Sequence, residues 1–293
     1  MGAGRDEACI GEILRSAASK FADAGIENGM IDAELLLGHC LDKTRTELYL
    51  AAAERVAAAE RDAIDAAIAR RCRREPVAYI IGEREFWSYP FLVTPAVLIP
   101  RPETEFLVEH ALSVLKARTG PARCLDLCCG SGAIGIVLAL ETGCRVIATD
   151  ISQAALAICR ENIEARGVSD KVFSVCTDLA AGVDPELRFD LVTANPPYVT
   201  RGAIETELEP DVADYEPVLA LDGGEDGLDL IRRIAAAAAS RLKATGHLYM
   251  EIGYDQGVRV SGIFLENSRC SGFKTVEILK DYAGRDRVVH VCR

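Results

Sequence analysis

The N-terminal part of this sequence lacks an uninterrupted hydrophobic run. Charged residues break every apolar stretch of MGAGRDEACIGEILRSAASK before a signal-peptide core or a membrane span can form. We therefore expect the protein to reside in the cytoplasm. Hydrophobic residues make up 49% of the 293 residues and charged residues 27%, which is typical of a folded globular protein and excludes a disordered or fibrous chain. The length favours two domains.

The sequence also lacks the paired cysteines of a zinc site. Its eleven cysteines are scattered along the chain, and in the closest cluster, Cys124, Cys128 and Cys129, two of the three are adjacent. Zinc sites use pairs of ligands at a short regular spacing, which is absent from this cluster. No metal site is predicted, and the cysteines are expected to be buried thiols in a reducing compartment.

An excess of basic residues is lacking as well. The chain has 45 acidic and 33 basic side chains, so its net charge is −12. This charge disfavours broad binding to a phosphate backbone, and a protein partner fits better. Residues 70–74 contain four arginines, but such a run at the end of a helix is typical of a solvated face that complements the helix dipole.

A small helical domain is predicted over residues 1–75. The region from about Glu7 to Arg74 contains no proline, is rich in Ala, Leu, Glu and Arg, and has apolar residues at helical spacing. Two roles stay open for this domain. It is either a stabilising appendage or a docking module for a macromolecular substrate.

A β-hairpin linker is predicted over residues 76–102, where the helical pattern ends. Its aromatic-rich segment 86–93 is typical of hairpin strands, with a turn expected around Ser88 to Pro90. The linker leads into a larger domain predicted over 103–293.

Strands and helices alternate after the linker. Strands are predicted at 123–127, 145–149, 172–176, 189–194, 247–252, 274–279 and 287–291. Helices are predicted between them at 133–141, 153–166, 228–243 and 256–266. This alternation predicts an α/β fold with a doubly wound, mostly parallel sheet covered by helices on both faces. The Ala-Gly-Arg-Asp turn before the last strand predicts an antiparallel C-terminal hairpin.

A glycine-rich loop ends the first strand of the sheet and opens a helix. Gly130, Gly132 and Gly135 match GxGxxG, which lets a ligand approach the backbone and the N–H groups of the helix start. Asp150, at the end of the second strand, can accept hydrogen bonds from both hydroxyls of a ribose. These features fit NAD and S-adenosylmethionine alike, so the loop alone leaves an NAD-dependent oxidoreductase open.

Asp126 discriminates between these two cofactors. It lies on the first strand just before the loop, where a carboxylate suits a ligand with an ammonium group better than a pyrophosphate. The alternative is a structural role as a capping or turn carboxylate.

An Asn-Pro-Pro-Tyr turn, Asn195–Tyr198, follows the fourth strand at the edge where open α/β sheets bind ligands. Two prolines make the turn rigid and leave its carbonyls available as acceptors. If the Asn195 oxygen and the Pro196 carbonyl each accept one N–H, a weakly nucleophilic amide or aromatic amine nitrogen is held with its lone pair directed at an electrophile. Tyr198 is expected to stack on the flat amide or base.

With the loop, the two aspartates and this turn together, the sequence resembles the class I amino-methyltransferases. Those enzymes bind S-adenosylmethionine on the glycine loop and present a nitrogen to its methyl group with an Asn/Asp-Pro-Pro-Tyr/Phe turn. Dehydrogenase chemistry does not call for such a turn, so the NAD interpretation is set aside. The resemblance implies the fold of that class, with a seven-stranded sheet.

Within this class the chain resembles the release-factor glutamine methyltransferases over essentially its whole length. The resembling segments are 98–105, 216–217, 220–228 and 283–287, together with the helical N-terminal region. The resemblance implies methyl transfer from S-adenosylmethionine to the side-chain amide nitrogen, N5, of the glutamine in the GGQ motif of peptide chain release factors. It also implies that the N-terminal domain recognises this protein substrate.

The motifs and the resemblance together assign the site residues. Catalytic roles are expected for Asn195, Pro196 and Tyr198, and the same residues with Pro197 are expected to bind the substrate. Cofactor contacts are expected from Asp126, Cys128, Cys129, Gly130, Ser131, Gly132, Asp150, Asp178, Leu179 and Asn195. The family commonly has Gly-Thr where this chain has Cys128-Cys129, and often an aromatic residue at Leu179. Cysteine keeps the loop compact, and leucine can still cover one face of the adenine.

Three other functions fit the sequence less well. A ribosomal-protein glutamine methyltransferase shares the Asn-Pro-Pro-Tyr turn but usually lacks the Arg-Pro-Glu-Thr-Glu sequence found here at Arg101–Glu105. A nucleic-acid adenine N6-methyltransferase needs a basic groove, which the net charge of −12 opposes. A non-catalytic protein-binding scaffold does not require the intact loop and turn.

Overall fold

The computed structural model describes residues 8–293, apart from the side chains of 267–271. The chain divides into two compact units. The helical unit comprises Met1–Glu83 with Glu209–Tyr215, and the sheet unit comprises Arg84–Leu208 with Glu216–Arg293. The sequence-based boundaries at 75 and 102 rest on the pattern of expected helices and strands and not on compactness. They stay a prediction.

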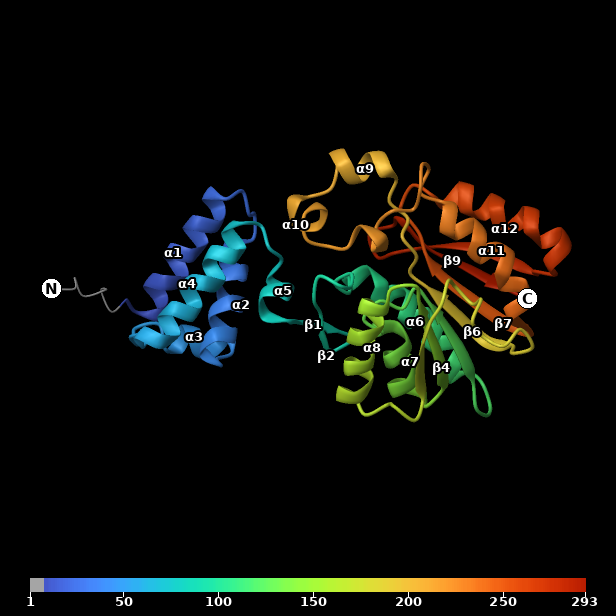
Figure 1. Ribbon diagram of the computed structural model, residues 1–293, viewed down its shortest axis with the longest axis horizontal. Coiled ribbons are helices and arrows are strands. Elements are labelled where there is room, and N and C mark those ends of the chain that lie inside the picture. The colour runs from blue at the N-terminus through green and yellow to red at the C-terminus, as the bar shows by residue number, and fades with distance from the viewer. Residues whose placement is uncertain (1–7) are drawn as a thin grey trace. The chain divides into compact units, whose positions relative to one another are not determined.

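The helical unit is built from α1 to α5, with the short helix α10 in its inserted segment. Their bounds are α1 Ile10–Asp23, α2 Gly29–Leu41, α3 Arg45–Leu50, α4 Ala58–Cys72, α5 Val77–Ile81 and α10 Pro210–Ala213. Phe21, Leu37 and Ile64 are fully buried between α1, α2 and α4, which Figure 1 draws side by side. A reciprocal pair of bonds between Thr44 and Glu47 caps α3 at its N-terminus.

The arginine run at the end of α4 is not a solvated face, and that expectation is wrong. Arg71 is only 6% exposed, and its guanidinium pairs with Asp32 on α2 at 2.7 Å and with Asp211 on α10 at 2.8 Å. Arg74 also pairs with Asp211, and with Glu209 at 3.0 Å. The arginines therefore hold the inserted segment of the helical unit, because buried guanidinium groups require carboxylate partners.

The predicted hairpin is formed by β1 Glu83–Phe86 and β2 Tyr89–Leu92. Its turn is made by Trp87 and Ser88, slightly before the predicted position. These residues have φ values of 54° and 61°, the positive values at both positions that characterise the type I′ turn of two-residue hairpin loops. Pro90, expected in the turn, lies within β2.

The sheet unit contains one seven-stranded sheet in the order β5-β4-β3-β6-β7-β9-β8. The strands are β3 Arg123–Leu127, β4 Arg145–Asp150, β5 Val172–Cys176, β6 Phe189–Ala194, β7 Leu242–Glu251, β8 Thr275–Lys280 and β9 Asp286–Cys292. The pairs among β3 to β7 are parallel, and β9 is antiparallel to β7 and β8. The predicted class and the C-terminal hairpin are confirmed. Strand β7 begins five residues before its predicted start, because the buried Leu242 already pairs with Phe189.

Helices cover both faces of this sheet (Figure 1). One apolar core packs α6 Pro102–Lys116, α7 Ala133–Thr142 and α8 Gln153–Ala165 against one face. A second core packs α11 Asp229–Arg241 and α12 Gly257–Ser271 against the other. Two short helices, α9 Arg201–Thr206 and the 3-10 helix η1 Val218–Ala220, lie between β6 and α11 in the chain. Across the described residues, none of the helices combines the length and the apolar character needed to cross a membrane.

Asp126 lies at the centre of the sheet unit. It is 0% exposed on β3, and its oxygens accept hydrogen bonds from the Thr193 hydroxyl at 2.8 Å and from the Gly135 N–H at 3.1 Å. Burial raises the pKa of Asp126 to about 7, against the opposing effect of these two donors and with a smaller contribution from the negative charge of Asp150. The structure thus gives this carboxyl group structural partners on β6 and α7.

We expect Asp126→Asn to remove a pH-dependent loss of stability. In the wild type the folded state retains a proton between about pH 4 and 7 that the unfolded state has released, so the free energy of unfolding falls as pH rises by up to about 1.4 kcal/mol per unit. The amide keeps one acceptor and one donor for the same neighbours. Denaturant unfolding measures the free energy of unfolding of both proteins from pH 4 to 8. Across this range the value for the variant should rise relative to the wild type by a few kcal/mol.

Asp190→Asn serves as the control. Burial raises the pKa of Asp190, but Lys243 and the Arg123 N–H outweigh this effect and hold that pKa below its ordinary value. Its proton is therefore absent from both states between about pH 5 and 7, and the variant should follow the wild-type slope in that range. A parallel curve for Asp126→Asn would contradict a raised pKa at Asp126.

Candidate active site

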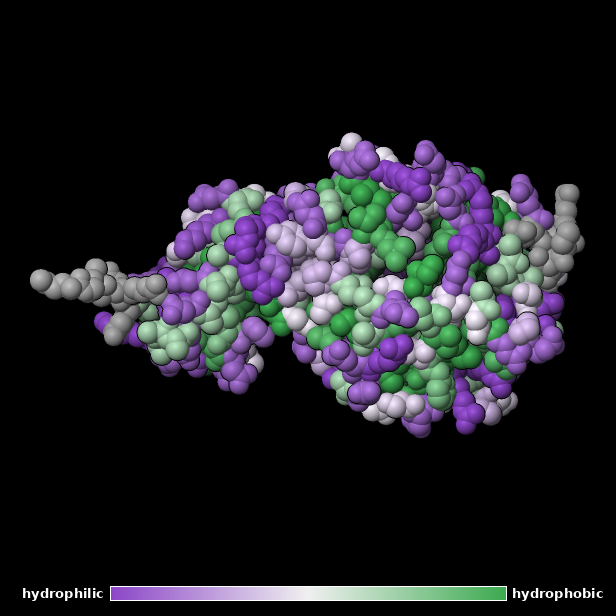
Figure 2. Space-filling view, viewed as in Figure 1, coloured by the Kyte–Doolittle hydropathy of each residue, from purple (hydrophilic) through white to green (hydrophobic). Residues whose placement is uncertain are grey.

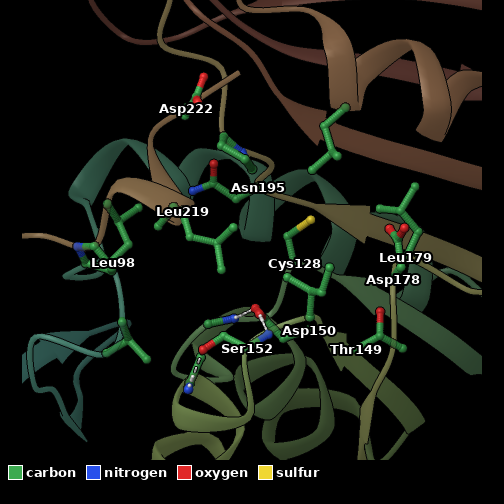
Figure 3. Close-up of a pocket in the computed structure, with 18 of the residues that line it drawn as sticks. Leu98, Cys128, Thr149, Asp150, Ser152, Asp178, Leu179, Asn195, Leu219 and Asp222 are labelled. Carbon is green, nitrogen blue, oxygen red and sulfur yellow. Dashed lines mark hydrogen bonds between the residues drawn. The ribbon is translucent and has the colours of Figure 1, made fainter. Parts of the chain in front are cut away.

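A cavity of about 280 Å³ opens at the carboxyl ends of β3, β4 and β6. This edge is the switch point of the sheet, because the chain runs from β3 outward through β4 to β5 and then returns to place β6 on the other side of β3. Figure 3 shows side chains from these strand ends and from two further segments surrounding one space. All of the lining residues belong to the sheet unit.

The glycine loop after β3 adopts left-handed backbone conformations at Cys128, Gly130 and Gly132, with φ values of 56°, 52° and 81°. A Cβ atom on Gly130 would meet nothing within 4 Å, so this glycine keeps space open where the loop lines the cavity. A Cβ atom on Gly132 would lie 2.6 Å from the Sγ atom of Cys159 on α8. Gly130 therefore serves the cavity, and Gly132 serves the packing of α7 against α8.

Asp150 ends β4 at the floor of the cavity in Figure 3. Its Oδ2 atom accepts from the Gly130 N–H at 2.9 Å, and its Oδ1 atom accepts from the Ser152 N–H at 2.9 Å. These bonds fix the carboxylate between the loop and the start of α8. Each oxygen retains a further lone pair, so the group can accept two hydroxyl donors of a ligand in the cavity.

Cys128 lines the cavity, whereas Cys129 is buried beneath the loop at 8% exposure. Burial, and then the negative charges of Asp150 and its acidic neighbours, raise the pKa of Cys128. A hydrogen bond with Cys159 and burial raise the pKa of Cys129. Both thiols are thus neutral, and the cavity gains a small apolar wall from Cys128 and no thiolate nucleophile.

Asp178 and Leu179 follow β5 and form another side of the cavity. Leu179 has a φ of 48° and packs against the second apolar core as well as lining the cavity. The Asp178 carboxylate pairs with Arg233 of α11 at 2.6 Å, and both side chains are about half exposed. The pair ties the β5 edge to α11 across the cavity rim.

The Asn-Pro-Pro-Tyr turn is held at both ends by one buried carboxylate. The Tyr198 hydroxyl donates to Glu251 Oε1 at 3.0 Å, and the Thr104 hydroxyl donates to Glu251 Oε2 at 2.7 Å. The Asn195 Nδ2 atom in turn donates to the Thr104 hydroxyl at 3.2 Å. Burial raises the pKa values of Tyr198 and Glu251, while the two hydroxyl donors oppose the rise at Glu251. Tyr198 is therefore anchored through its hydroxyl in the sheet unit's interior.

Two segments distant in sequence complete the cavity, and Glu216 joins them. It is 4% exposed and accepts hydrogen bonds from the Arg101 guanidinium and from the Ile99 N–H at 3.3 Å. Burial raises the pKa of Glu216, and Arg101 opposes this rise. Residues 96–98 and 217–222, on either side of these contacts, contribute Leu98, Leu219 and Asp222 to the lining.

The cavity gathers about half of the residues assigned from sequence. Those that line it are Cys128, Gly130, Asp150, Asp178, Leu179, Asn195 and Pro197. Those that do not are Asp126, Cys129, Ser131, Gly132, Pro196 and Tyr198. For Asp126 the structural alternative is supported, because this side chain is 0% exposed, lies outside the cavity lining and accepts hydrogen bonds from two protein donors. The functional roles of all these residues stay predictions.

Several lining residues escaped the sequence assignment, notably Leu98, Thr149, Ser152, Leu219, Asp222 and Arg233. Leu98 and Asp222 lie in segments 98–105 and 220–228, which carry the family resemblance, so a signal was present without a role attached to it. Arg233 sits in an alanine-rich helix and has no sequence signal. Its place beside Asp178 depends on how α11 packs on the sheet.

Family models match both parts of the chain. A model described as "PrmC N-terminal domain" matches residues 12–82, and one described as "Methyltransferase small domain" matches residues 103–213. A solved T. thermophilus 16S rRNA N2 G1207 methyltransferase, RsmC, is similar in fold, with a TM-score of 0.51 and 21% identity. The similarity covers 72% of this chain and 49% of that one, and it shows the fold alone.

Full-length relatives share more of the sequence. The release factor glutamine methyltransferase of Cereibacter sphaeroides is 42% identical over 95% of this chain and 96% of its own length. Its counterpart in Geobacter sulfurreducens is 38% identical over 96% of this chain and 95% of its own length. With such identity across both units and the methyltransferase sheet described above, the chain belongs to the release factor glutamine methyltransferase family.

Proposed function

We propose that this protein transfers a methyl group from S-adenosylmethionine to the N5 amide nitrogen of the glutamine in the GGQ motif of a peptide chain release factor. One observation carries the proposal. Asp150 and Asn195 line the same cavity from strands on opposite sides of β3, so a nucleoside site and an amide-presenting turn share one space. The names of the full-length relatives support the release factor as substrate. Such a substrate belongs to the cytoplasm.

The described residues fit an adenosine-containing cofactor. The fixed Asp150 carboxylate is the acceptor for the two ribose hydroxyls, and Gly130 leaves room for the group to lie against the loop. Leu179 and Ile151, which both line the cavity, supply apolar surface for the adenine. Bound there, S-adenosylmethionine supplies an electrophilic methyl group with a neutral thioether as leaving group.

The turn supplies the other half of the reaction. Asn195 Oδ1 and the Pro196 carbonyl accept the two N–H groups of the glutamine amide, which positions its nitrogen for in-line attack. A new N–C bond forms as the C–S bond breaks, and the nitrogen releases one proton to water. No covalent enzyme intermediate is involved, since the neutral Cys128 thiol is a poor nucleophile.

The function is tested by offering the protein labelled S-adenosylmethionine with a release factor, a ribosomal protein or DNA in parallel. We expect label on the release factor alone, and at the GGQ glutamine by mass spectrometry. Asn195→Ala should bind the cofactor unchanged but transfer the methyl group about a hundredfold more slowly in a single turnover, because positioning and hydrogen bonding are lost together. Label on the ribosomal protein or DNA instead would overturn the substrate assignment.

Asp150→Ala should weaken S-adenosylmethionine binding by about 1.5–3 kcal/mol, which is the range for a hydrogen bond to a charged group. Isothermal titration calorimetry measures this change, and the exposed Asp184→Ala, in the loop after β5, is the matched control. A melting profile of each variant checks that the loop remains folded. Equal affinities for wild type and Asp150→Ala would remove the ribose contact from the proposal.

The helical unit is proposed to recognise the release factor. Its helix α2 exposes Met30, Ile31 and Leu35 by 40%, 50% and 49%, and the hydrophobic residues visible on this unit in Figure 2 lie among hydrophilic ones. Exposed apolar side chains of this kind contribute to protein interfaces. Under this proposal the helical unit is a docking module for the substrate and not a stabilising appendage.

We expect the double variant Ile31→Ser, Leu35→Ser to raise the KM for intact release factor about thirtyfold while kcat stays unchanged, since apolar contacts at an interface contribute on the order of 1 kcal/mol each. Methylation of a short GGQ peptide should not change, because such a peptide lacks the remaining surface of the release factor that is proposed to contact the helical unit. Val258→Ser, at an exposed apolar residue of α12, is the control. An unchanged KM for intact release factor would argue for the appendage.

A further inference from the structure

Asn195 ends a chain of hydrogen bonds that begins at Glu251. Thr104, in the first turn of α6, and Glu251, at the end of β7, are 4% and 1% exposed. The Thr104 hydroxyl lies 2.7 Å from Glu251 Oε2 and 3.2 Å from Asn195 Nδ2. Neither Thr104 nor Glu251 lines the cavity, so both act on a ligand only through other residues.

In the ionised form of Glu251, the chemistry of these groups fixes the direction of every proton in the chain. The Thr104 and Tyr198 donors and the charge of Arg287 favour that form against the effect of burial. Its carboxylate has acceptors only, so Oε1 and Oε2 require the hydroxyls of Tyr198 and Thr104 to donate. A hydroxyl carries a single proton, and Thr104 uses it toward Glu251. Its remaining contact with Asn195 must then be as an acceptor, which requires the NH₂ end of the amide to face Thr104.

The orientation of this amide decides what the cavity presents. With Nδ2 held by Thr104, the Oδ1 atom of Asn195 is the end left for a ligand in the cavity that Asn195 lines. A flipped amide would present an NH₂ group there, and two N–H groups facing each other repel. Since the two ends differ little in size, packing alone does not select between them, and the hydrogen-bond partner does.

We propose that Thr104 and Glu251 are positioning residues that set the amide orientation of Asn195, so that its oxygen faces the nitrogen to be methylated. The inference rests on the proposed function for its catalytic meaning, although the orientation itself does not depend on the substrate. Glu251 holds Tyr198 by its other oxygen, and one carboxylate thereby fixes both ends of the turn. If the role were purely structural, the same bonds would serve only to hold α6 against β7.

The orientation is tested first, without substrate, by NMR of the full-length protein. The side-chain NH₂ signals of Asn195 are assigned by their loss in Asn195→Ala. One of the two protons should exchange slowly with water in the wild type and in Thr104→Ser, which keeps the hydroxyl. In the nearly isosteric Thr104→Val this proton should exchange at least tenfold faster. Equal protection in all three proteins would overturn the inference, whatever the enzyme methylates.

The catalytic consequence is tested by a double-mutant cycle with release factor in single turnovers. Thr104→Val should lower the transfer rate about tenfold in the wild type, with unchanged cofactor affinity, and Thr104→Ser should restore it to within about threefold. In the Asn195→Ala background the same change should have no further effect, because the residue through which Thr104 acts is gone.

The outcomes separate the two hypotheses. A full tenfold loss from Thr104→Val in the Asn195→Ala background would show that Thr104 acts on the fold and would overturn the positioning role. Protection of the Asn195 amide together with no methylation of release factor by the wild type would leave the amide orientation standing and refute the proposed function.

Discussion

The buried carboxylate of Glu251 is the constraint on which the arrangement of the turn depends. It receives one hydroxyl from the turn itself, Tyr198, and one from α6, Thr104. Removing such a charge from water is costly unless donors satisfy it, so the carboxylate, both hydroxyls and the strand end must form together. The rigid pair of prolines between Asn195 and Tyr198 is then held in place at both of its ends.

The order of the strands sets the distance between the two sides of the cavity. Parallel strands end at one edge, and the return of the chain across β3 leaves a crevice between the end of β4 and the end of β6. Asp150 and Asn195 stand at these two ends, and the neutral Cys128 lies on the loop between them. The spacing of the strands thus separates the residue proposed to bind the nucleoside from the residue proposed to present the amide.

Buried charged side chains also join distant segments of the chain away from the strand ends. Glu216 joins the segment before α6 to the segment that contains η1, and both segments line the cavity. In the helical unit, Arg71 joins α4 to the inserted segment through Asp211. In each case the ionic partner lies more than a hundred residues away in the chain. Such pairs select one arrangement, because an unpaired partner would leave a buried charge.

The sequence by itself determined the features that depend on local patterns. Strand and helix periodicity predicted the seven strands of the sheet, and the loop glycines and the Asn195 turn were located from residue types at fixed spacing. Only the tertiary structure decided the partners of buried polar groups. Asp126, assigned to the cofactor from its position before the loop, accepts hydrogen bonds from Thr193 and Gly135. The contacts of Thr104 with Asn195 and of Arg71 with Asp211 join residues far apart in the sequence. The physical reason is that hydrogen bonds and ion pairs act over a few ångströms, so a partner is defined by packing between elements and not by separation along the chain.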